Sequence, residues 1–232
     1  MMEQIADVGN GNYSYIDSLN EARKVLVDEL GNTFNTVAKD VKVQIEFNPN
    51  VVSEYRLLGY ENRQLNREDF NNDKVDAGDV GAGKSVTAIY EITPKTATPA
   101  MDALRYQNGK PVLETSKTNS NQELAFLKIR YKKPEGTKSI LLTRPITQPN
   151  HVTSFANATD NQRFATAVAG FGQLLRQSTQ VNTLTYAQVA QIAQQAKGND
   201  PTGSKGEFVQ LVKNAEVLAG KAGKKEAVLV RD

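Results

Sequence analysis

The stretch Asp40-Val-Lys-Val-Gln-Ile-Glu-Phe47 alternates apolar and polar side chains with a period of two residues. One face carries Val41, Val43, Ile45 and Phe47, and the other carries Lys42, Gln44 and Glu46. This period is typical of a β-strand with one buried face. Ser85-Val-Thr-Ala-Ile-Tyr-Glu-Ile92 shows a similar alternation, and the segment between the two stretches is rich in Asn, Asp and Arg. The two stretches therefore predict a β-sheet at the centre of the chain.

Three more strand candidates complete the predicted sheet domain, which spans residues 40–150. They lie at residues 54–60, 123–132 and 138–143, and Pro134-Glu-Gly136 is a turn signal between the last two. Residues 94–122 are rich in Thr, Pro, Ser and Asn, so we expect a long loop there, with room for one extra strand near Val112. The pattern favours an antiparallel, β-sandwich-like domain.

Residues 1–39, before the sheet domain, show a helix–strand–helix pattern. Residues 2–8 are predicted to end a helix at Gly9, and Asn12-Tyr-Ser-Tyr-Ile16 is predicted to form a short strand. A second helix is expected from Ser18, which forms a capping-box pattern with Glu21. Its apolar stripe consists of Leu19, Ala22, Leu26, Leu30, Phe34 and Val37. We expect this stripe to pack on the sheet domain or on a second copy of the chain.

Residues 151–232 are predicted to be helical. The capping-box pattern occurs three times, at Thr159 with Gln162, Thr185 with Gln188, and Ser204 with Glu207. An apolar stripe follows each pair, and Gly198 and Gly220 are the expected ends of the second and third helices. The tail 221–232 is expected to add a strand or to be disordered. A small helical cluster after a sheet domain predicts an α+β fold class.

Composition excludes several kinds of site. The chain has 232 residues, a net charge of +2, no cysteine and one histidine, His151. Thiol nucleophiles, thiolate zinc sites and sites with two histidines are therefore excluded. A nearly neutral charge predicts no general attraction to nucleic acid. No apolar run has the length of a membrane span, and the first residues lack a signal peptide, so we expect the chain to be part of a longer protein.

The segment Gly78-Asp-Val-Gly-Ala-Gly-Lys-Ser85 matches the phosphate-binding loop G-x-x-x-x-G-K-[ST]. In such a loop Lys84 would contact the terminal phosphate and Ser85 would bind magnesium. The motif also requires a buried strand before it and a helix after it. Here a polar segment precedes it and a strand pattern follows, so we expect a glycine-rich turn, and nucleotide binding remains an alternative.

A second alternative is a calcium site between Asp69 and Asp76. Asp69, Asn71, Asp73 and Asp76 place oxygen ligands at spacings that resemble a calcium loop. The glycine expected at the sixth position is Lys74, and the glutamate expected at the twelfth is Val80. A solvated loop rich in Asp and Asn is the other interpretation, which we favour.

Several segments carry a family resemblance. Gln4-Ile-Ala-Asp-Val-Gly-Asn-Gly-Asn-Tyr-Ser-Tyr-Ile-Asp17 resembles the last helix-to-strand step of a von Willebrand factor type A domain, and the helix from Ser18 resembles its closing helix. Residues 41–49, 55–62, 68–78 and 81–92 resemble the region that follows this domain in bacterial YfbK-like proteins. The resemblance covers nearly the whole chain.

The resemblance implies three parts: the end of a type A domain (1–39), a β-sandwich-like domain (40–150) and a helical domain with a tail (151–232). Type A domains bind metal through an Asp-x-Ser-x-Ser motif, which this sequence lacks. We therefore assign no catalytic, cofactor-binding or metal-ligating residue. The expected role is non-enzymatic: a structural or binding region at the cell envelope that supports protein–protein interaction or adhesion. Its expected partner is a protein ligand, without nucleic acid or a direct membrane span.

Overall fold

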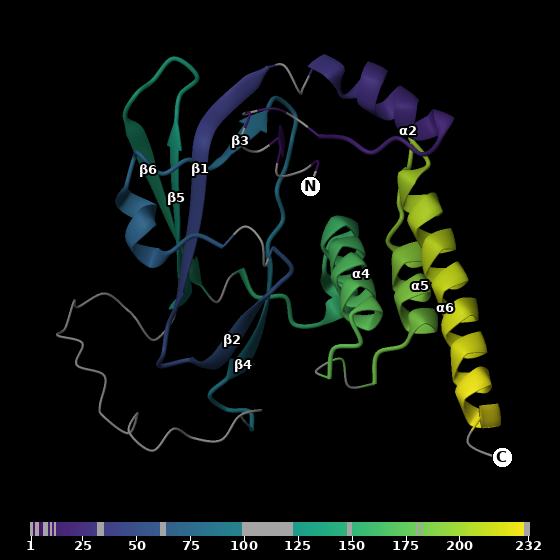
Figure 1. The fold of residues 1–232 in the computed structure, drawn as a ribbon. Helices are drawn as coiled ribbons and strands as arrows, with labels where there is room; N and C mark the ends of the chain where they lie inside the picture. The colour runs from purple at the N-terminus through teal and green to yellow at the C-terminus, as the bar shows by residue number, and fades with distance from the viewer. Residues whose placement is uncertain are drawn as a thin grey trace. The chain divides into compact units, whose positions relative to one another are not determined.

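The structure is a computed structural model that describes residues 2, 5, 6, 9, 11, 13–31, 35–60, 64–98, 123–147, 150–179, 181 and 183–229 (Figure 1). The chain divides into two compact units. Met1–Val86 with Tyr90–His151 forms the first, and Thr87–Ile89 with Val152–Asp232 forms the second. Antiparallel strands make up the core of the first unit and helices that of the second, which confirms the α+β class. The predicted three-part division stays a prediction.

A four-stranded sheet dominates the first unit. Its strands are β1 (Thr36–Phe47), β3 (Gly78–Gly81), β5 (Glu123–Lys132) and β6 (Ser139–Thr147). They follow the order β3-β1-β5-β6, and each pair is antiparallel. The prediction for 123–132 is confirmed at both ends, whereas β3 was missed because a strand of four residues rich in glycine has little period-two signal. Most of the predicted loop, residues 99–122, lies outside the described residues.

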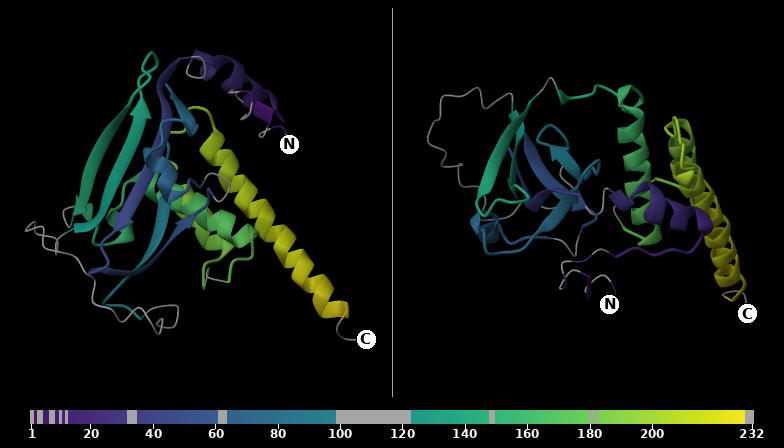
Figure 2. Two further views of the ribbon diagram at one scale, coloured as in Figure 1. Left: turned by 60° about the vertical axis from the view of Figure 1, so that its left-hand side comes forward. Right: turned by 90° about the horizontal axis from the view of Figure 1, so that it is seen from above.

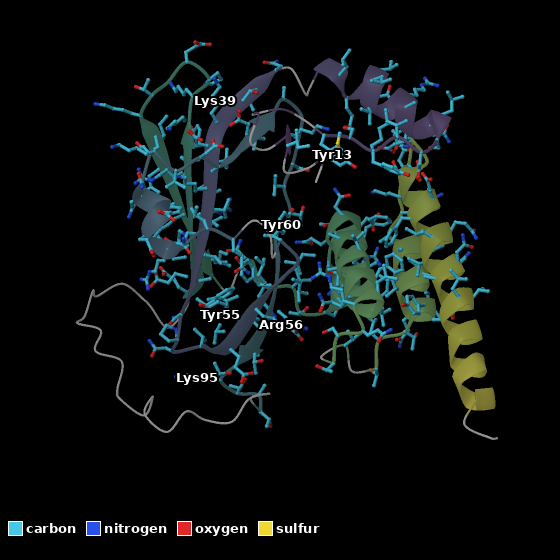
Figure 3. All side chains as sticks on the ribbon, in the orientation of Figure 1. Tyr13, Lys39, Tyr55, Arg56, Tyr60 and Lys95 are labelled. Carbon is cyan, nitrogen blue, oxygen red and sulfur yellow. The ribbon has the colours of Figure 1, made fainter. Side chains whose placement is uncertain are left out.

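A smaller sheet pairs β2 (Val52–Leu58) with β4 (Ile89–Pro94). The Lys95 amide donates to the carbonyl of Val51 at 2.9 Å, beside the end of this pair. Figure 3 labels Tyr55 and Arg56 on β2, where Arg56 pairs with Glu91 of β4 at 2.5 Å. The strand predicted from Ser85 begins only at Ile89, since residues 85–88 are irregular.

The buried face predicted for β1 is wrong at its centre. Lys42 is only 4% exposed, whereas Val43 is 55% exposed. A register shift between Lys39 and Lys42 interrupts the pairing with β5 just before these residues. The reason for the inversion is that the segment around η3 (Arg67–Asn71) covers the Lys42 side of the sheet, with Phe70 buried beneath it.

The N-terminal prediction is only partly confirmed. Ile5 and Ala6 are helical, and the Gly9 amide donates to the Ile5 carbonyl at 3.1 Å, as the predicted helix end requires. The strand predicted at Asn12–Ile16 is wrong for its described residues 13–16, which are irregular. A strand needs a hydrogen-bonded neighbour, and no described strand pairs with this segment.

The helix predicted from Ser18 consists of α2 (Leu19–Arg23) and a π-helical turn, η1 (Lys24–Asp28). The Ser18 hydroxyl accepts the Glu21 amide at 3.2 Å, so the predicted cap is present. Val37, expected in the helix stripe, lies in β1 instead. Leu19 and Leu26 are 86% and 55% exposed, so the stripe does not pack on the sheet as predicted. Packing on a second copy stays a prediction.

Three α-helices form the core of the second unit, α4 (Asp160–Leu175), α5 (Tyr186–Gln195) and α6 (Ser204–Leu229), and a short 3-10 helix, η6 (Phe155–Asn157), precedes them. Both halves of the capping boxes at Thr159 and Thr185 are present, which confirms these predictions. Phe171 packs edge-on against Phe208 of α6 at 5.5 Å and against Tyr186 of α5 at 6.1 Å. The core also contains the fully buried Val189 and Val212.

The third predicted cap is wrong, because Asp200 replaces Ser204 as the capping acceptor. Ser204 is the first helical residue of α6, and the Asp200 carboxylate accepts the amides of Gly206 at 2.8 Å and Lys205 at 3.2 Å. The helix also continues through Gly220 to Leu229, beyond α4 and α5 (Figure 2), so the tail is neither a strand nor disordered over 221–229. A glycine inside a helix costs only about 1 kcal/mol, which makes it a weak stop signal.

Candidate functional site

The segment that matches a phosphate-binding loop forms a turn after an edge strand. Residues 78–81 are β3, which pairs antiparallel with β1, and the chain turns at Ala82 and Gly83, where φ is +70°. The Ala82 amide donates to the Asn35 carbonyl at 2.8 Å, and the Lys84 amide donates to the Gly81 carbonyl at 3.2 Å. These two amides are therefore engaged within the protein and do not form a phosphate cradle.

The side chain of Lys84 is engaged as well. Its ammonium group pairs with the Glu29 carboxylate at 2.6 Å. Residues 84–88 are irregular, so the helix that a phosphate-binding loop needs does not follow Ser85. The arrangement supports the glycine-rich turn and gives the nucleotide alternative no support.

The segment proposed as a calcium loop is held to the sheet by cationic side chains. The ammonium group of Lys42 donates to the carbonyls of Asp69 at 3.3 Å and Asn72 at 2.5 Å. These bonds satisfy a charge that is nearly enclosed, and they fix the curve of the chain after η3.

Arg130 of β5 holds the next part of this segment. Its guanidinium group donates to the Asn71 side-chain oxygen at 3.1 Å and lies 3.7 Å from the Asp73 carboxylate. It also lies 5.8 Å from the centre of the Phe70 ring. Asp73 accepts the Ser139 hydroxyl at 2.6 Å, and this bond is the main reason that the pKa of Asp73 is below its ordinary value.

Lys132 closes the far end of the segment. It pairs with Asp40 at 2.6 Å, and that contact is the largest of the effects that raise the pKa of Lys132. Burial alone would raise the pKa of Asp40, but bonds from Lys132, Asp76 and the Ala77 amide hold it below its ordinary value. Burial raises the pKa of Asp76, and the hydrogen bond to Asp40 and its charge raise it further. Asp40 therefore keeps its charge while Asp76 retains a proton to higher pH.

This geometry describes a charge cluster that fastens a loop to a sheet. The basic residues of β5, Lys128, Arg130 and Lys132, face carboxylates rather than an open surface. Among the described residues, no three Asp, Glu, His or Cys side chains are grouped so as to hold a metal ion. The calcium alternative gains no support from these contacts, because the proposed ligand oxygens of Asn71 and Asp73 accept hydrogen bonds from the protein itself.

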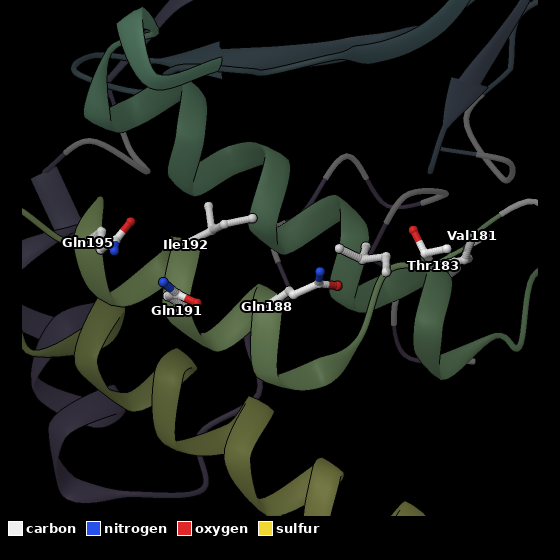
Figure 4. A pocket seen from close by; sticks show the side chains of 7 residues that line it. Val181, Thr183, Gln188, Gln191, Ile192 and Gln195 are labelled. Atoms are coloured by element: carbon white, nitrogen blue, oxygen red, sulfur yellow. The ribbon is translucent and has the colours of Figure 1, made fainter. Parts of the chain in front are cut away.

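An open hollow of about 400 Å³ lies along α5 in the second unit (Figure 4). Three glutamine side chains of α5, Gln188, Gln191 and Gln195, line it together with Val181, Thr183, Leu184 and Ile192. None of these side chains titrates near neutral pH, so the hollow carries no general acid or base. Amide and apolar groups of this kind can bind a ligand, but they provide no proton-transfer chemistry.

The remaining residue singled out by the sequence, His151, is exposed at the last position of the first unit. Sequence reasoning missed two residues that the structure makes important, Lys42 and Asp200. Lys42 sits on the polar side of an alternating strand, and Asp200 lies four residues before α6, outside the usual capping position.

Among the described residues, no helix is long and apolar enough to cross a membrane.

Comparison with known proteins gives a family match over most of the chain. Residues 32–218 match the family described as "Uncharacterized protein YfbK, C-terminal". The chain is 50% identical over 216 residues to "Uncharacterized protein YfbK" of Escherichia coli strain K12. This match covers 93% of the chain and 36% of the relative, so the chain spans about a third of the length of the curated protein that it matches. No solved structure matches the chain.

Proposed function

Because the chain belongs to the family of YfbK C-terminal regions, we propose that it is a non-enzymatic binding region of a cell-envelope protein, in which it acts beside a von Willebrand factor type A domain. In this role it supports protein–protein interaction or adhesion. The chain matches only 36% of its relative, which leaves room for such a domain in the longer protein.

The observation that carries this proposal is the exposed apolar surface of α2 and η1. Leu19 is 86% exposed, Val27 67% and Leu26 55%. Leu19 lies in α2, and Leu26 and Val27 lie in η1, so exposed apolar side chains occur in both parts of this short segment. Apolar groups clustered in this way mark a surface that binds another protein part. The resemblance of this segment to the closing helix of a type A domain supports the body of that domain as its neighbour.

The chemistry of the candidate sites also supports binding over catalysis. The lysine of the phosphate-loop motif is paired with Glu29, and the carboxylates of the charge cluster face lysine, arginine and serine side chains. The hollow on α5 offers amide and apolar groups to a ligand. Each of these arrangements stabilises structure or contacts a partner without a free nucleophile or base.

The test compares the effect of one substitution on stability in this chain and in the full-length E. coli relative. Leu26→Asp is made in this chain and at the aligned position of the full-length E. coli relative. In this chain Leu26 is exposed, so the free energy of unfolding changes by less than about 0.5 kcal/mol. In the full-length protein the same carboxylate would be buried at an interface, and we expect a loss of about 2–5 kcal/mol. Thermal melting and urea unfolding measure both.

Asn20→Asp is the matched control, because it adds the same carboxylate at an exposed polar position of α2, the helix directly before η1. Asn20→Asp should leave the free energy of unfolding unchanged in both proteins. Equal effects of Leu26→Asp in both lengths would contradict a bound surface here. Fractionation of cells that express the full-length relative tests the location: recovery with the envelope is expected, and recovery only with soluble cytoplasmic proteins would contradict that part of the proposal.

A further inference from the structure

The last strand of the four-stranded sheet, β6, has one open edge. It pairs with β5 on one side, and no described strand pairs with its other side (Figure 1). The strand at the opposite end of the sheet, β3, has four residues, whereas β6 has nine. Leu141 and Leu142 point to opposite faces of the sheet, yet they are 47% and 51% exposed. Their exposure therefore marks the edge of the sheet rather than one of its faces.

Hydrogen bonds at the two ends of β6 show which backbone groups face this open edge. The Ser139 amide donates to the Asp73 carboxylate at 3.4 Å, and the Thr147 amide donates to the Asn150 side-chain oxygen at 3.1 Å, so neither amide bonds β5. Pro145, which has no amide hydrogen, falls in the same alternation, as a proline in an edge strand must. In an antiparallel strand the N–H and C=O of every second residue turn to the same side. The odd-numbered residues of β6 consequently face the open edge.

This alternation leaves two amides in the middle of the edge for another strand. They belong to Leu141 and Thr143, which are both exposed, and the carbonyls of these residues face the same way. Side chains occupy the amides at the two ends of β6, and Pro145 offers none. A strand edge with open donors and acceptors is a template for another strand. Here the template is a short window between two blocked positions.

A second copy of β6 fits this window in one antiparallel register. With Leu142 opposite Leu142 of the second copy, Leu141 of each copy lies opposite Thr143 of the other. Both residues of each such pair face the open edge, so each pair exchanges two N–H···O bonds and all four open amides are satisfied. A shift of two residues either way sets Leu141 opposite Pro145, or Thr143 opposite Ser139, whose amide is already bonded. Reciprocal bonding over the whole window is then lost.

The side chains agree with the same register. Val43 of β1, Ile129 of β5 and Leu142 already form one cross-strand row, and the contact would continue this row into the row of the second copy. The backbone groups of Leu142 turn to β5, so the two leucines form a non-hydrogen-bonded pair, in which side chains come closest. Arg144, the one charged residue of β6, lies opposite Ile140 of the second copy, so no like charges face each other directly.

We propose that two copies of this chain associate through β6, with Leu142 at the two-fold axis, and join their four-stranded sheets edge to edge. A second copy fits better than an unrelated extended segment, because the window matches itself in its open amides, its leucine and its lack of opposed charge. Few residues bond fully, so the contact belongs to the class of small, weak interfaces. The inference goes beyond the proposed function, since it concerns a different surface from α2 and η1 and holds whether or not an envelope partner binds.

Disulfide trapping tests the register, because the chain contains no cysteine of its own. Leu142→Cys and Leu141→Cys are made separately, and the similar exposure of the two leucines makes the second a matched control. In the proposed dimer the two copies of position 142 have Cα atoms about 4.5 Å apart, which a disulfide bridges. The two copies of position 141 are offset by two residues and lie about 8 Å apart, which is too far. Mild oxidation and a non-reducing gel compare the two variants.

We expect Leu142→Cys to form a covalent dimer and Leu141→Cys to stay largely monomeric. Equal trapping of the two variants, or trapping of Leu141→Cys alone, would overturn the proposed register.

Sedimentation equilibrium tests the association without a cross-link. The mean mass of the unaltered chain should rise towards that of two chains as its concentration approaches about 1 mM, as a weak interface predicts. Thr143→Pro removes one open amide but no bond to β5, so it should abolish the rise, whereas Thr143→Val keeps the amide and should preserve it. Circular dichroism checks that both variants are folded. A mass that stays that of one chain, or a rise that survives in folded Thr143→Pro, would overturn the proposal and assign the edge to another segment.

Discussion

Lys42 organises a loop through backbone carbonyls rather than through a carboxylate partner. Its side chain is 4% exposed, and its ammonium group reaches the carbonyls of Asp69 and Asn72. Because a buried charge must be satisfied by hydrogen bonds, this contact fixes where the segment after η3 lies on the sheet.

We therefore expect Lys42→Met to lower the free energy of unfolding by about 1–3 kcal/mol, because the methionine fills similar space but removes one of the two donors to each carbonyl; the amides of Asn72 and Val75 still donate to the carbonyls of Asp69 and Asn72. Lys39→Met is the control, since Lys39 is an exposed lysine of the same strand (labelled in Figure 3) and its loss should change stability by less than about 0.5 kcal/mol. Urea unfolding measures both. Equal effects of the two variants would contradict the role given to Lys42.

Asp200 stabilises the start of α6 from outside the helix. Burial alone would raise the pKa of Asp200, but the amides of Gly206 and Lys205 and the charges of Lys197 and Lys205 together hold it below its ordinary value. A carboxylate with a lowered pKa stabilises the folded state at neutral pH, and this contribution is lost as the pH falls through its folded-state pKa.

Asp200→Ala should accordingly cost about 0.5–2 kcal/mol at pH 7, as removal of a helix cap does. The difference in free energy of unfolding between wild type and variant should shrink as the pH falls below about 4, where aspartate begins to take up a proton in the unfolded chain. Ser204→Ala, at the position that sequence reasoning nominated, should change stability by less than about 0.5 kcal/mol. A larger loss from Ser204→Ala than from Asp200→Ala would refute this account of the cap.

At the scale of elements, α4 shows how two glycines of one helix differ. A Cβ at Gly170 would come within 2.8 Å of the Leu184 side chain, whereas a Cβ at Gly172 meets nothing within 4 Å. Gly170 therefore permits the close approach of the segment that leads into α5, and Gly172 has no such role.

Gly172→Ala should raise the free energy of unfolding by about 0.5–1 kcal/mol through helix propensity alone. Gly170→Ala gains the same propensity but must displace Leu184, so a net loss of about 1 kcal/mol is expected from overpacking. Thermal melting followed by far-ultraviolet circular dichroism compares the pair. Stabilisation by both substitutions would mean that Leu184 moves without cost.

The turn after β3 gives a prediction about the nucleotide alternative. Because Lys84 pairs with Glu29 and no helix follows Ser85, calorimetry with Mg-ATP should detect no micromolar binding. Lys84→Ala should leave the titration unchanged and lower stability by at most about 1 kcal/mol, as loss of a surface ion pair does. Micromolar affinity that disappears in Lys84→Ala would instead establish a phosphate-binding loop.

Local signals in the sequence predicted the elements well. The strand 123–132 and the capping boxes at Thr159 and Thr185 depend on residues close together in the chain, and all three are confirmed. The side of β1 that carries Lys42 was predicted to be exposed. This is wrong at Lys42, because the segment that covers it lies about thirty positions away in the sequence. Periodicity identifies two faces of a strand, but only tertiary packing decides which face is covered.

The same reason explains why the candidate sites needed the structure. The phosphate-loop motif is a local pattern, yet its meaning depends on the strand before it and the helix after it. The spacing of the carboxylates between Asp69 and Asp76 left a calcium site open as an alternative. The structure places Arg130 and Ser139, from strands far along the chain, beside Asn71 and Asp73. Charge pairing between distant segments leaves no spacing signal in a sequence.

For the whole molecule, exposed apolar side chains occur in both units, among them Leu19 and Leu26 in α2 and η1 and Leu211 and Leu218 in α6. The helical unit also encloses a core, in which Val189 and Val212 are fully buried. The proposed interface at α2 and η1 predicts that this segment gains protection from the longer family protein, whereas the core of the helical unit does not.

Hydrogen exchange with mass spectrometry tests this central claim most directly. Exchange is measured for the full-length E. coli relative and for its matched C-terminal region alone, with α5 as the internal reference. We predict that the segment aligned with α2 and η1 exchanges more slowly in the full-length protein, because its apolar side is then covered, while α5 exchanges alike in both. Identical exchange of all these segments in the two lengths would contradict the account.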